Sequence, residues 1–409
     1  MGCIVSTSQD GSPARRKKTG NVSEVVAFVP GLRIPKSIDL GESLHGYSSA
    51  SIVERLSALR TRISIMTAEE LPTTAKTKRK TSTQQGGSTL GDLQQALEDY
   101  LPVLLGLAKK GSQQTDLVEF SWINQEDDEK ETSLSNTWYE VLSILHMMAM
   151  TCLLQANSLL IPKAPADGYP PKVSEENKKA SIDMFLKAGG YLDYGARHIL
   201  IQIPNEVKSK LPTDLHEGVL QAISAQALGQ CVEIQLGMAI DSPKATLAVK
   251  RRLACEQVEY WRQAQHCISD VRLENDWGQK HVLFIQWKFA EAKAAAYYYH
   301  GLILDEGNEE SAHTKAVACL RAAEQFLKES KSACINFCLA TPVTRVPPVW
   351  GAMKYLYEMI PKDASSKAQA KGDAYNFQKL LEGLPKLPNF PVALKPDEYE
   401  MPPIDSSWN

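Results

Sequence analysis

Apolar residues recur every three or four positions through most of the chain after residue 90. This spacing places them on one face of an α-helix. The clearest runs lie in three stretches, and their apolar members are Trp138, Val141, Leu142, Leu145, Met148 and Cys152; Leu220, Ile223, Ala227, Cys231, Ile234 and Met238; and Val282, Ile285, Phe289, Ala292, Ala296, Tyr299 and Ile303. The pattern therefore predicts several long helices, each with a buried face.

Small residues, such as Ala292 and the three alanines at 294–296, allow neighbouring helices to pack closely. Antiparallel helix pairs stacked like a solenoid would use them in this way. No 34-residue sequence period is present, which argues against a consensus repeat array. Residues 24–40 form the one strand-like stretch, so the predicted fold class is mainly helical, or all-α.

Three polar or proline-rich segments punctuate this pattern. Residues 72–89 are predicted to be a polar loop, and residues 162–172 to be a proline-rich connection between helices. Residues 384–409 carry six prolines and cannot be helical for most of their length. We expect this last segment to be an extended strap over the helical body or a free tail.

The helix predicted over residues 246–265 has two apolar faces. One face carries Leu247, Ala254, Val258 and Trp261. Val249 and Leu253 point almost the opposite way, with Tyr260 beside them. Such a helix is either sandwiched between two layers of core or has an outer face that forms the floor of a groove for a partner. A partner helix would fill such a groove with apolar residues at i, i+3, i+4 and i+7.

Composition and charge narrow the class of protein. The 409 residues are 43% hydrophobic and 23% charged, which is ordinary for a globular protein. The net charge of −3 argues against general nucleic-acid binding. The chain has neither an uninterrupted run of about 18 apolar residues nor the apolar core of a secretory signal. We therefore expect a chain that faces the cytosol, with its cysteines as buried thiols.

The N-terminal sequence MGCIVS matches a lipidation signal. Gly2 would be myristoylated, since Ser6 stands where the pattern requires Ser or Thr, and Cys3 could then be palmitoylated. A single myristoyl chain binds membranes only marginally, so a second attachment is needed. Cys3 could supply it, and so could a basic cluster near an anionic membrane, made of Arg15, Arg16, Lys17 and Lys18.

Motifs for catalysis, metal or cofactor binding are missing from the sequence. It contains no P-loop, no G-x-S-x-G elbow, no H-E-x-x-H and no Cys/His cluster. The acidic run 126–129 is expected to be a solvated loop rather than a metal site. We therefore expect no enzyme activity, no metal and no cofactor.

Several segments, in order, resemble the Bro domain of Alix and Brox proteins. The closest likeness is to the lipid-anchored plant members that consist of a Bro domain alone. The similar segments run through most of the chain and are LEDYLPVLLGL, VEFSW, WYEVLSILHMMAMTCLLQA, FLKAGGYLDY, AQALGQ, RLACEQVEYW, KFAEAKAAAYYYHG and YEMIP (357–361). The resemblance implies a boomerang-shaped helical domain with a TPR-like solenoid core.

The resemblance also implies a partner, the C-terminal amphipathic helix of an ESCRT-III subunit that polymerises on endosomal membranes. Aligned on RLACEQVEYW, the family's apolar groove positions fall on Val249 and Leu253, the pair that the helical pattern sets apart. The family's basic groove residue falls on Lys178, and a further apolar groove position falls near Cys231 or Leu236.

These observations together predict a flexible acylated tether (1–23), a Bro-like domain (24–400) and a short tail (401–409). We expect a monomeric, non-enzymatic adaptor on the cytosolic face of the endosome or plasma membrane, with a further cytosolic pool, that binds an ESCRT-III helix and an anionic membrane surface. The alternative is a lipid-anchored helical scaffold that binds another peptide, such as a phosphorylated tail. Lys250, Arg251 and Arg252 are adjacent and fan around the helix, which counts against that alternative.

Overall fold

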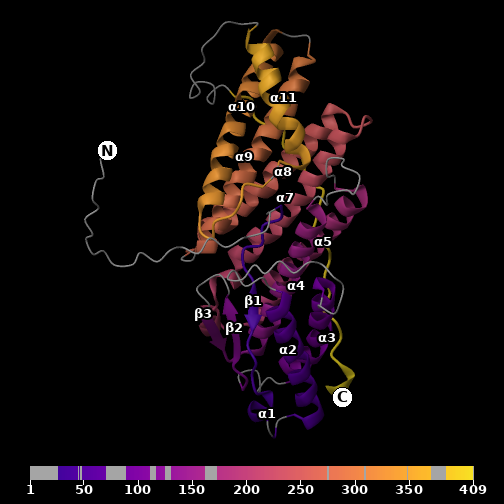
Figure 1. Cartoon of the computed structure of the whole chain (residues 1–409), viewed down its shortest axis with the longest axis vertical. Coiled ribbons are helices and arrows are strands. Elements are labelled where there is room, and N and C mark those ends of the chain that lie inside the picture. Colours follow the sequence, from indigo (N-terminus) through magenta and orange to yellow (C-terminus); the bar gives the residue numbers. More distant parts are fainter. Residues whose placement is uncertain are drawn as a thin grey trace, which may run out of the picture.

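The computed structural model describes residues 26–44, 46, 48–70, 89–110, 117–124, 130–161, 173–273, 276–307, 310–347, 349–369 and 384–408. Most of these residues are helical, and the helices stack along one long axis (Figure 1). The mainly helical fold class that the sequence predicts is confirmed.

One end of the molecule combines helices with a small sheet. Its elements are β1 (Arg33–Pro35), α1 (Leu40–Ser43), α2 (Ala50–Glu70), α3 (Leu90–Lys110), β2 (Phe120–Asn124), β3 (Lys130–Leu134) and α4 (Thr137–Leu160). The strands form an antiparallel sheet in the order β1-β2-β3, with Ile34 opposite Ile123 and Trp122 opposite Thr132. Because Phe120 and Trp122 alternate with half-buried residues, the sheet turns one apolar face towards the core.

The rest of the chain forms the helical stack. Its α-helices are α5 (Glu175–Tyr194), α6 (Asn205–Lys208), α7 (Glu217–Asp241), α8 (Leu247–Ser269), α9 (Asp276–Asp305), α10 (Glu310–Leu339) and α11 (Gly351–Gln369). Between α5 and α7 lie also the π-helix η1 (Gly195–Ile199) and the 3-10 helices η2 (Leu200–Gln202) and η3 (Thr213–Leu215). From α7 to α11 each long helix packs against the next in sequence, and α5 packs against α4 and α7. This is the stacked-pair arrangement expected from the apolar pattern.

Side-chain caps start several of these helices. Asn136, Ser174 and Thr246 each accept a hydrogen bond from a backbone N–H three residues later, at the first turns of α4, α5 and α8. These bonds satisfy donors that a helix leaves free at its N-terminus. The caps thus fix where α4 begins and where α5 and α8, which carry Lys178, Val249 and Leu253, begin.

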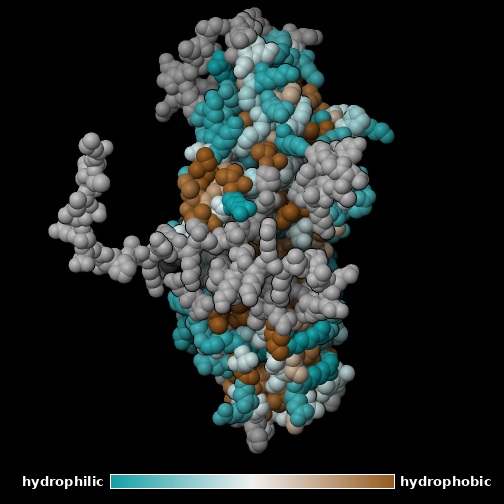
Figure 2. Space-filling view, viewed as in Figure 1, coloured by the Kyte–Doolittle hydropathy of each residue, from teal (hydrophilic) through white to brown (hydrophobic). Residues whose placement is uncertain are grey.

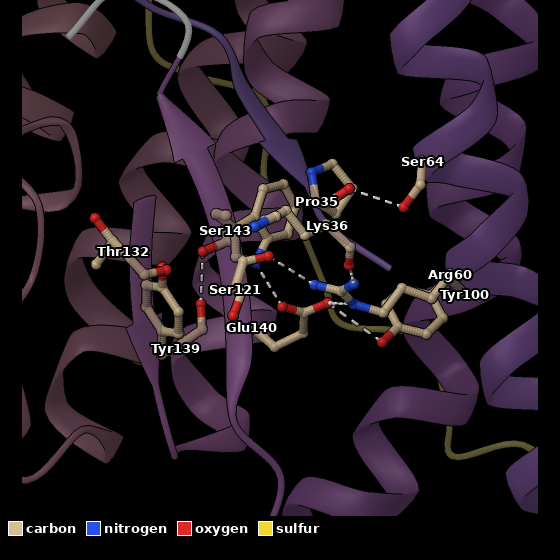
Figure 3. A network of polar contacts seen from close by, with 11 residues as sticks. Pro35, Lys36, Arg60, Ser64, Tyr100, Ser121, Thr132, Tyr139, Glu140 and Ser143 are labelled. Carbon is tan, nitrogen blue, oxygen red and sulfur yellow. Dashed lines mark hydrogen bonds and ion pairs between the residues drawn. The ribbon is translucent and has the colours of Figure 1, made fainter. Parts of the chain in front are cut away.

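Glu140 of α4 joins the sheet to α2 and α3. Its Oε1 accepts hydrogen bonds from Arg60 Nε at 2.8 Å and the Tyr100 hydroxyl at 3.3 Å, and its Oε2 accepts one from Trp122 Nε1 at 2.6 Å (Figure 3). All four side chains are buried. Since a buried charge is costly unless it is paired and hydrogen-bonded, this cluster specifies how the elements meet.

The first described residues lie across the stack. Val26 N–H donates to Asn157 Oδ1 at 2.8 Å, and the buried amides of Gln230 and Gln226 donate to the carbonyl groups of Val26 and Phe28. Phe28 packs among aromatic rings of α9 and α10. The N-terminal segment is thereby held over α7.

The C-terminal residues 384–405 form an extended strap that runs down beside α5 and α3 and ends in the short 3-10 helix η4 (Ser406–Trp408) (Figure 1). Near its end, Asp405 pairs with Arg55 at 2.8 Å and Trp408 Nε1 donates to the Val103 carbonyl at 2.9 Å. The Trp408 indole lies so close to Gly106 that a Cβ there would fall 2.1 Å from Nε1. Of the two expectations for this segment, the strap is confirmed.

The strand predicted within residues 24–40 is confirmed, but it is shorter than that stretch and two further strands accompany it. Within it only Arg33–Pro35 is a strand, and β2 and β3 were not predicted. Both missed strands have five residues, and β3 is mostly polar, so neither gives a clear alternation of apolar and polar positions.

Among the described helices, α4 is long and apolar enough to cross a membrane, but 78% of the relevant window is buried inside the molecule. It is the central core helix of its end of the fold, packed against α3 and α5. The seven described cysteines are free thiols, all buried except the half-buried Cys267, as predicted. Residues 72–88, 126–129 and 162–172, predicted as loops, lie outside the described residues.

Candidate partner-binding surface

The sequence-predicted partner residues come from two helices that flank α7. Lys178 lies in the first turn of α5, and Val249 and Leu253 lie in the first two turns of α8. Both α5 and α8 pack against α7. We refer to the surface over α7 that Lys178, Val249, Leu253 and Asp241 border as the α5–α8 surface.

The two apolar residues on α8 differ in exposure. Val249 is 46% exposed, a large value for an aliphatic side chain. Leu253, one turn later, is half-buried and packs against two core clusters. The outer face of α8 is therefore open at Val249 and closes progressively towards Tyr260, which is buried.

Lys178 provides the positive charge of this surface. Its Nζ pairs with Asp241 Oδ2 at the end of α7, at 3.1 Å. The Lys178 side chain is 26% exposed and that of Asp241 is 72% exposed. A pair this open contributes little to stability, because water screens it, so either charge is free to exchange partners.

The strap covers the other end of the α5–α8 surface. Leu394 packs against a buried cluster of Leu228, Val232 and Tyr260, and Leu186 of α5 and Leu253 of α8 pack against the same cluster. The chain's own C-terminal segment thus occupies the space over α7 at the level of Leu253. The Val249 end is not part of this cluster.

Hydrogen bonds fix the strap at this point. Glu256 Oε1 accepts from the backbone N–H groups of Ala393 and Leu394, at 2.6 and 3.1 Å. The Tyr260 hydroxyl donates to the Leu394 carbonyl at 2.5 Å. Burial and the neighbouring Glu256 raise the pKa of Tyr260, so this hydroxyl stays a donor. The bond between Asp397 N–H and the Leu186 carbonyl, at 3.2 Å, completes the attachment to α5.

Two predicted groove residues do not reach this surface. Cys231 and Leu236 of α7 have no exposed area, so neither can contact a partner in this structure. Cys231 belongs to the main core, and Leu236 faces the cluster formed with α9, α10 and α11. Their assignment to the groove is corrected, because α7 is enclosed on several sides.

Leu394 and Glu256 were missed by reasoning from the sequence. The proline-rich composition predicted an extended segment, but not the residues over which it would lie. Gly2, Cys3 and the basic residues Arg15, Arg16, Lys17 and Lys18 lie outside the described residues. Within the described part of the chain, no three His, Cys, Asp or Glu side chains converge as metal ligands would.

The stacked helices, the three-stranded sheet and the extended C-terminal strap define a helical scaffold of the Bro type. A model of the BRO1-like domain matches residues 33–380, and the chain belongs to this family.

The relatives agree with this assignment. A BRO1 domain-containing protein BROX homolog of Caenorhabditis elegans is 24% identical over 308 residues, which cover 73% of this chain and 67% of that protein. The fold is similar to the ALIX BRO1 domain in an ALIX BRO1–CHMP4C complex, with a TM-score of 0.59, 13% identity and coverage of 95% and 96% of the two chains. It is also similar to ALIX in complex with the SIVmac239 PYKEVTEDL late domain, with a TM-score of 0.61 and 15% identity; 93% of this chain is covered, but only 49% of that ALIX chain.

Proposed function

We propose that the chain is a membrane-anchored, non-enzymatic adaptor that binds the C-terminal amphipathic helix of an ESCRT-III subunit on the α5–α8 surface. The observation that carries the proposal is the exposed Val249, one turn before Leu253, on a Bro-type scaffold. An i, i+4 pair of apolar residues is what an amphipathic helix contacts. A related ALIX BRO1 domain occurs in a complex with CHMP4C, which supports this class of partner.

The strap determines which part of the surface is open to the partner. Since Leu394 covers the same buried cluster as Leu253, the partner helix would lie towards the N-terminal end of α8, across Val249. Lys178 and Asp241 lie at that end and offer both signs of charge to polar residues at the edges of the helix. A phosphorylated tail is less well supported, since the Arg251 guanidinium lies over the ring of Phe390 in the strap rather than beside a second cation.

The anchor would be at the other end of the chain. Acylation of Gly2 and Cys3, with the basic cluster 15–18, would hold the protein on the cytosolic face of the endosome or plasma membrane. Confinement to the membrane raises the effective concentration of a weakly bound partner that polymerises there. The adaptor therefore needs only modest intrinsic affinity for the helix.

The test is a titration of the purified, unacylated full chain with a fluorescent peptide of an ESCRT-III C-terminal helix. We expect micromolar binding and at least a tenfold loss in Val249→Asp, because a charge would replace an apolar contact in the interface. Leu253→Asp should also abolish binding, but Leu253 packs against a buried cluster, so the folding of this variant must be checked by circular dichroism. Ile335→Asp is the matched control, since Ile335 is equally exposed but lies on α10.

Failure of every such helix to bind the folded chain would overturn the ESCRT-III assignment. Binding of a phosphopeptide instead would favour the alternative scaffold. The anchor is tested separately by flotation of the full chain, expressed with an N-myristoyltransferase, on vesicles containing anionic lipid. Gly2→Ala should stay unbound, and Cys3→Ser in a eukaryotic host should weaken retention.

A further inference from the structure

A second hollow lies on a different part of the molecule. It has a volume of about 300 Å³ and is enclosed by α9, α10, the start of α11 and the 340–350 connection. Its walls include Trp287, Trp350 and Met353, and its rim includes Ile335 and Val349. A volume of this order is within the range of ligand-binding pockets.

The rim of the hollow belongs to an exposed apolar patch. Ile335 is 51% exposed, and Leu339, one turn later on α10, is 69% exposed. Val343, Val346 and Val349 in the adjoining connection are also exposed. Figure 2 shows apolar side chains gathered over this end of α10. Apolar side chains clustered in this way on a surface mark interaction sites.

The floor of the hollow is charged and buried. Lys288 Nζ lies 2.6 Å from Glu233 Oε1 and 2.6 Å from Glu291 Oε2, and Trp287 Nε1 donates to Glu291 Oε1 at 2.8 Å. Glu233 and Lys288 are almost completely buried. Burial lowers the pKa of Lys288, but the two neighbouring carboxylates outweigh burial and raise it above its usual value, so the lysine stays charged.

One atom of this floor has no partner. The described part of the chain offers no hydrogen-bond donor to Glu233 Oε2, although this oxygen is buried. A buried acceptor without a hydrogen bond carries a desolvation penalty that a suitable donor would remove. Glu233 is also one of the residues that line the hollow. The site therefore combines apolar walls with an unpaired acceptor, Glu233 Oε2, on a residue that lines the hollow.

We propose that this hollow binds an aromatic side chain that carries a hydrogen-bond donor, a tryptophan indole or a tyrosine phenol, presented by a partner polypeptide. Such side chains have a large apolar body and a polar tip, which match the walls and the acceptor. A phenylalanine or an aliphatic side chain would contact the apolar walls but leave Glu233 Oε2 unpaired.

A cationic ligand fits less well. Lys288 already lies between the two carboxylates and over the rings of Trp287 and Trp350, at 5.1 and 5.7 Å from their centres. A second cation would face this ammonium group at close range in a medium of low dielectric constant. A neutral donor satisfies Glu233 Oε2 without that repulsion.

The apolar patch argues for a polypeptide rather than a free small molecule. Leu339 and Val343 extend the apolar surface beyond the hollow, so flanking residues of a bound segment would cover what one aromatic ring cannot. The connection that borders the hollow is held in place from below. Lys280 Nζ donates to the Ala340 carbonyl and to Thr344 Oγ1, both at 3.2 Å, so little ordering is needed on binding.

The first experiment titrates the full chain with N-acetyl-tryptophanamide, N-acetyl-tyrosinamide and N-acetyl-phenylalaninamide, observed by ligand-detected NMR. We expect the first two to bind with Kd on the order of 1 mM. The phenylalanine derivative should bind about tenfold more weakly, because it forms no hydrogen bond to Glu233. Equal affinity of all three compounds, or no binding of any, would overturn the proposal.

Exposed rim variants locate the site without disturbing the core. Ile335→Asp and Val349→Asp should each weaken binding of the tryptophan derivative at least fivefold. Val249→Asp on α8 should leave binding of this compound unchanged. Glu233→Gln, if it folds, should reduce the preference for indole and phenol over phenyl. Unchanged binding in both rim variants would overturn the proposal. Because Val249→Asp and Ile335→Asp act on separate surfaces, this failure is distinguishable from failure of the ESCRT-III helix to bind.

Discussion

Leu394 of the C-terminal strap and Leu253 of α8 pack against the same buried cluster, formed by Leu228, Val232 and Tyr260, so the chain itself covers part of the surface that the resemblance assigns to a partner helix. The second apolar face of α8 is thus divided between two roles. Towards Tyr260 it is core, closed by the strap, and at Val249 it is exposed. The core explanation that the sequence left open for this helix is confirmed at Tyr260, whereas the partner groove stays a prediction for the exposed turn at Val249.

Removing the acceptor that holds the strap should release it locally. Glu256→Ala deletes the carboxylate that accepts the N–H groups of Ala393 and Leu394, at 2.6 and 3.1 Å. Hydrogen bonds to a charged group contribute about 1.5–3 kcal/mol each, so amide exchange at these two residues should accelerate at least tenfold. Hydrogen exchange read by NMR or mass spectrometry measures this. Glu259→Ala, a variant of the same helix whose carboxylate pairs with Arg262 instead, should leave the strap protected.

The end of the strap should be displaced by a single methyl group. Gly106→Ala would place a Cβ within 2.4 Å of three atoms of the Trp408 indole. Both rigid groups cannot occupy that space, so Trp408 should leave and lose its hydrogen bond to Val103. We expect faster proteolysis of the C-terminal segment and a red-shifted tryptophan emission.

The control for this prediction lies in the same helix. Gly91→Ala is the same substitution in the first turn of this helix, but its Cβ would meet only the Thr89 hydroxyl, at 3.5 Å. If Gly91→Ala exposes the strap as much as Gly106→Ala does, the Trp408 contact is not what holds the segment.

Neutralising the buried carboxylate of Glu140 should destabilise the whole domain. Glu140→Gln leaves the charge of Arg60 buried without its counter-ion, since the two atoms lie 2.8 Å apart and both side chains are almost fully buried. Breaking such a pair costs about 3–5 kcal/mol. Urea denaturation should show this loss. Glu131→Gln breaks an ion pair with Lys36 whose side chains are both about 40% exposed, and it should cost less than about 1 kcal/mol.

The sequence predicts the long helices because the apolar residues of each recur with the period of an α-helix. The runs around Val141, Ile223 and Ile285 lie in α4, α7 and α9. It does not predict that α7 is enclosed on several sides, because the helix carries Gln226, Gln230 and other polar residues that would normally mark a solvent face. The amides of these two glutamines instead bind the carbonyl groups of the N-terminal segment.

The candidate sites were predicted only in part for the same reason. Val249 could be set apart because its position on a helical wheel depends on local spacing alone. The contact of Leu394 with α8, and the unpaired oxygen of Glu233, depend on segments that are distant in sequence. Local sequence patterns carry no information on contacts between distant segments, so only the folded chain shows these contacts.

Two buried histidines should make the fold sensitive to acid. Burial lowers the pKa of His281 to about 3 and that of His146 to about 4. The His281 ring donates through Nε2 to Gln226 Oε1 at 2.9 Å, since an amide oxygen can only accept. Both histidines are therefore neutral in the folded state and take up a proton on unfolding below pH 6.5, their ordinary pKa. The unfolded state binds more protons in that range, so stability falls as the pH falls.

The size of this effect follows from the pKa difference. Between pH 6.5 and 5, each neutral buried histidine should lower the free energy of unfolding by about 1.6 kcal/mol. His281→Gln keeps a donor for Gln226 but cannot titrate, so its stability should decline less steeply than that of the wild type over this range. Burial raises the pKa of Glu233 to about 6, which acts in the opposite direction, but this contribution is common to both proteins and cancels in the comparison. Urea denaturation of the two proteins at a series of pH values measures the difference, and parallel profiles would show that His281 is not held neutral in the folded chain.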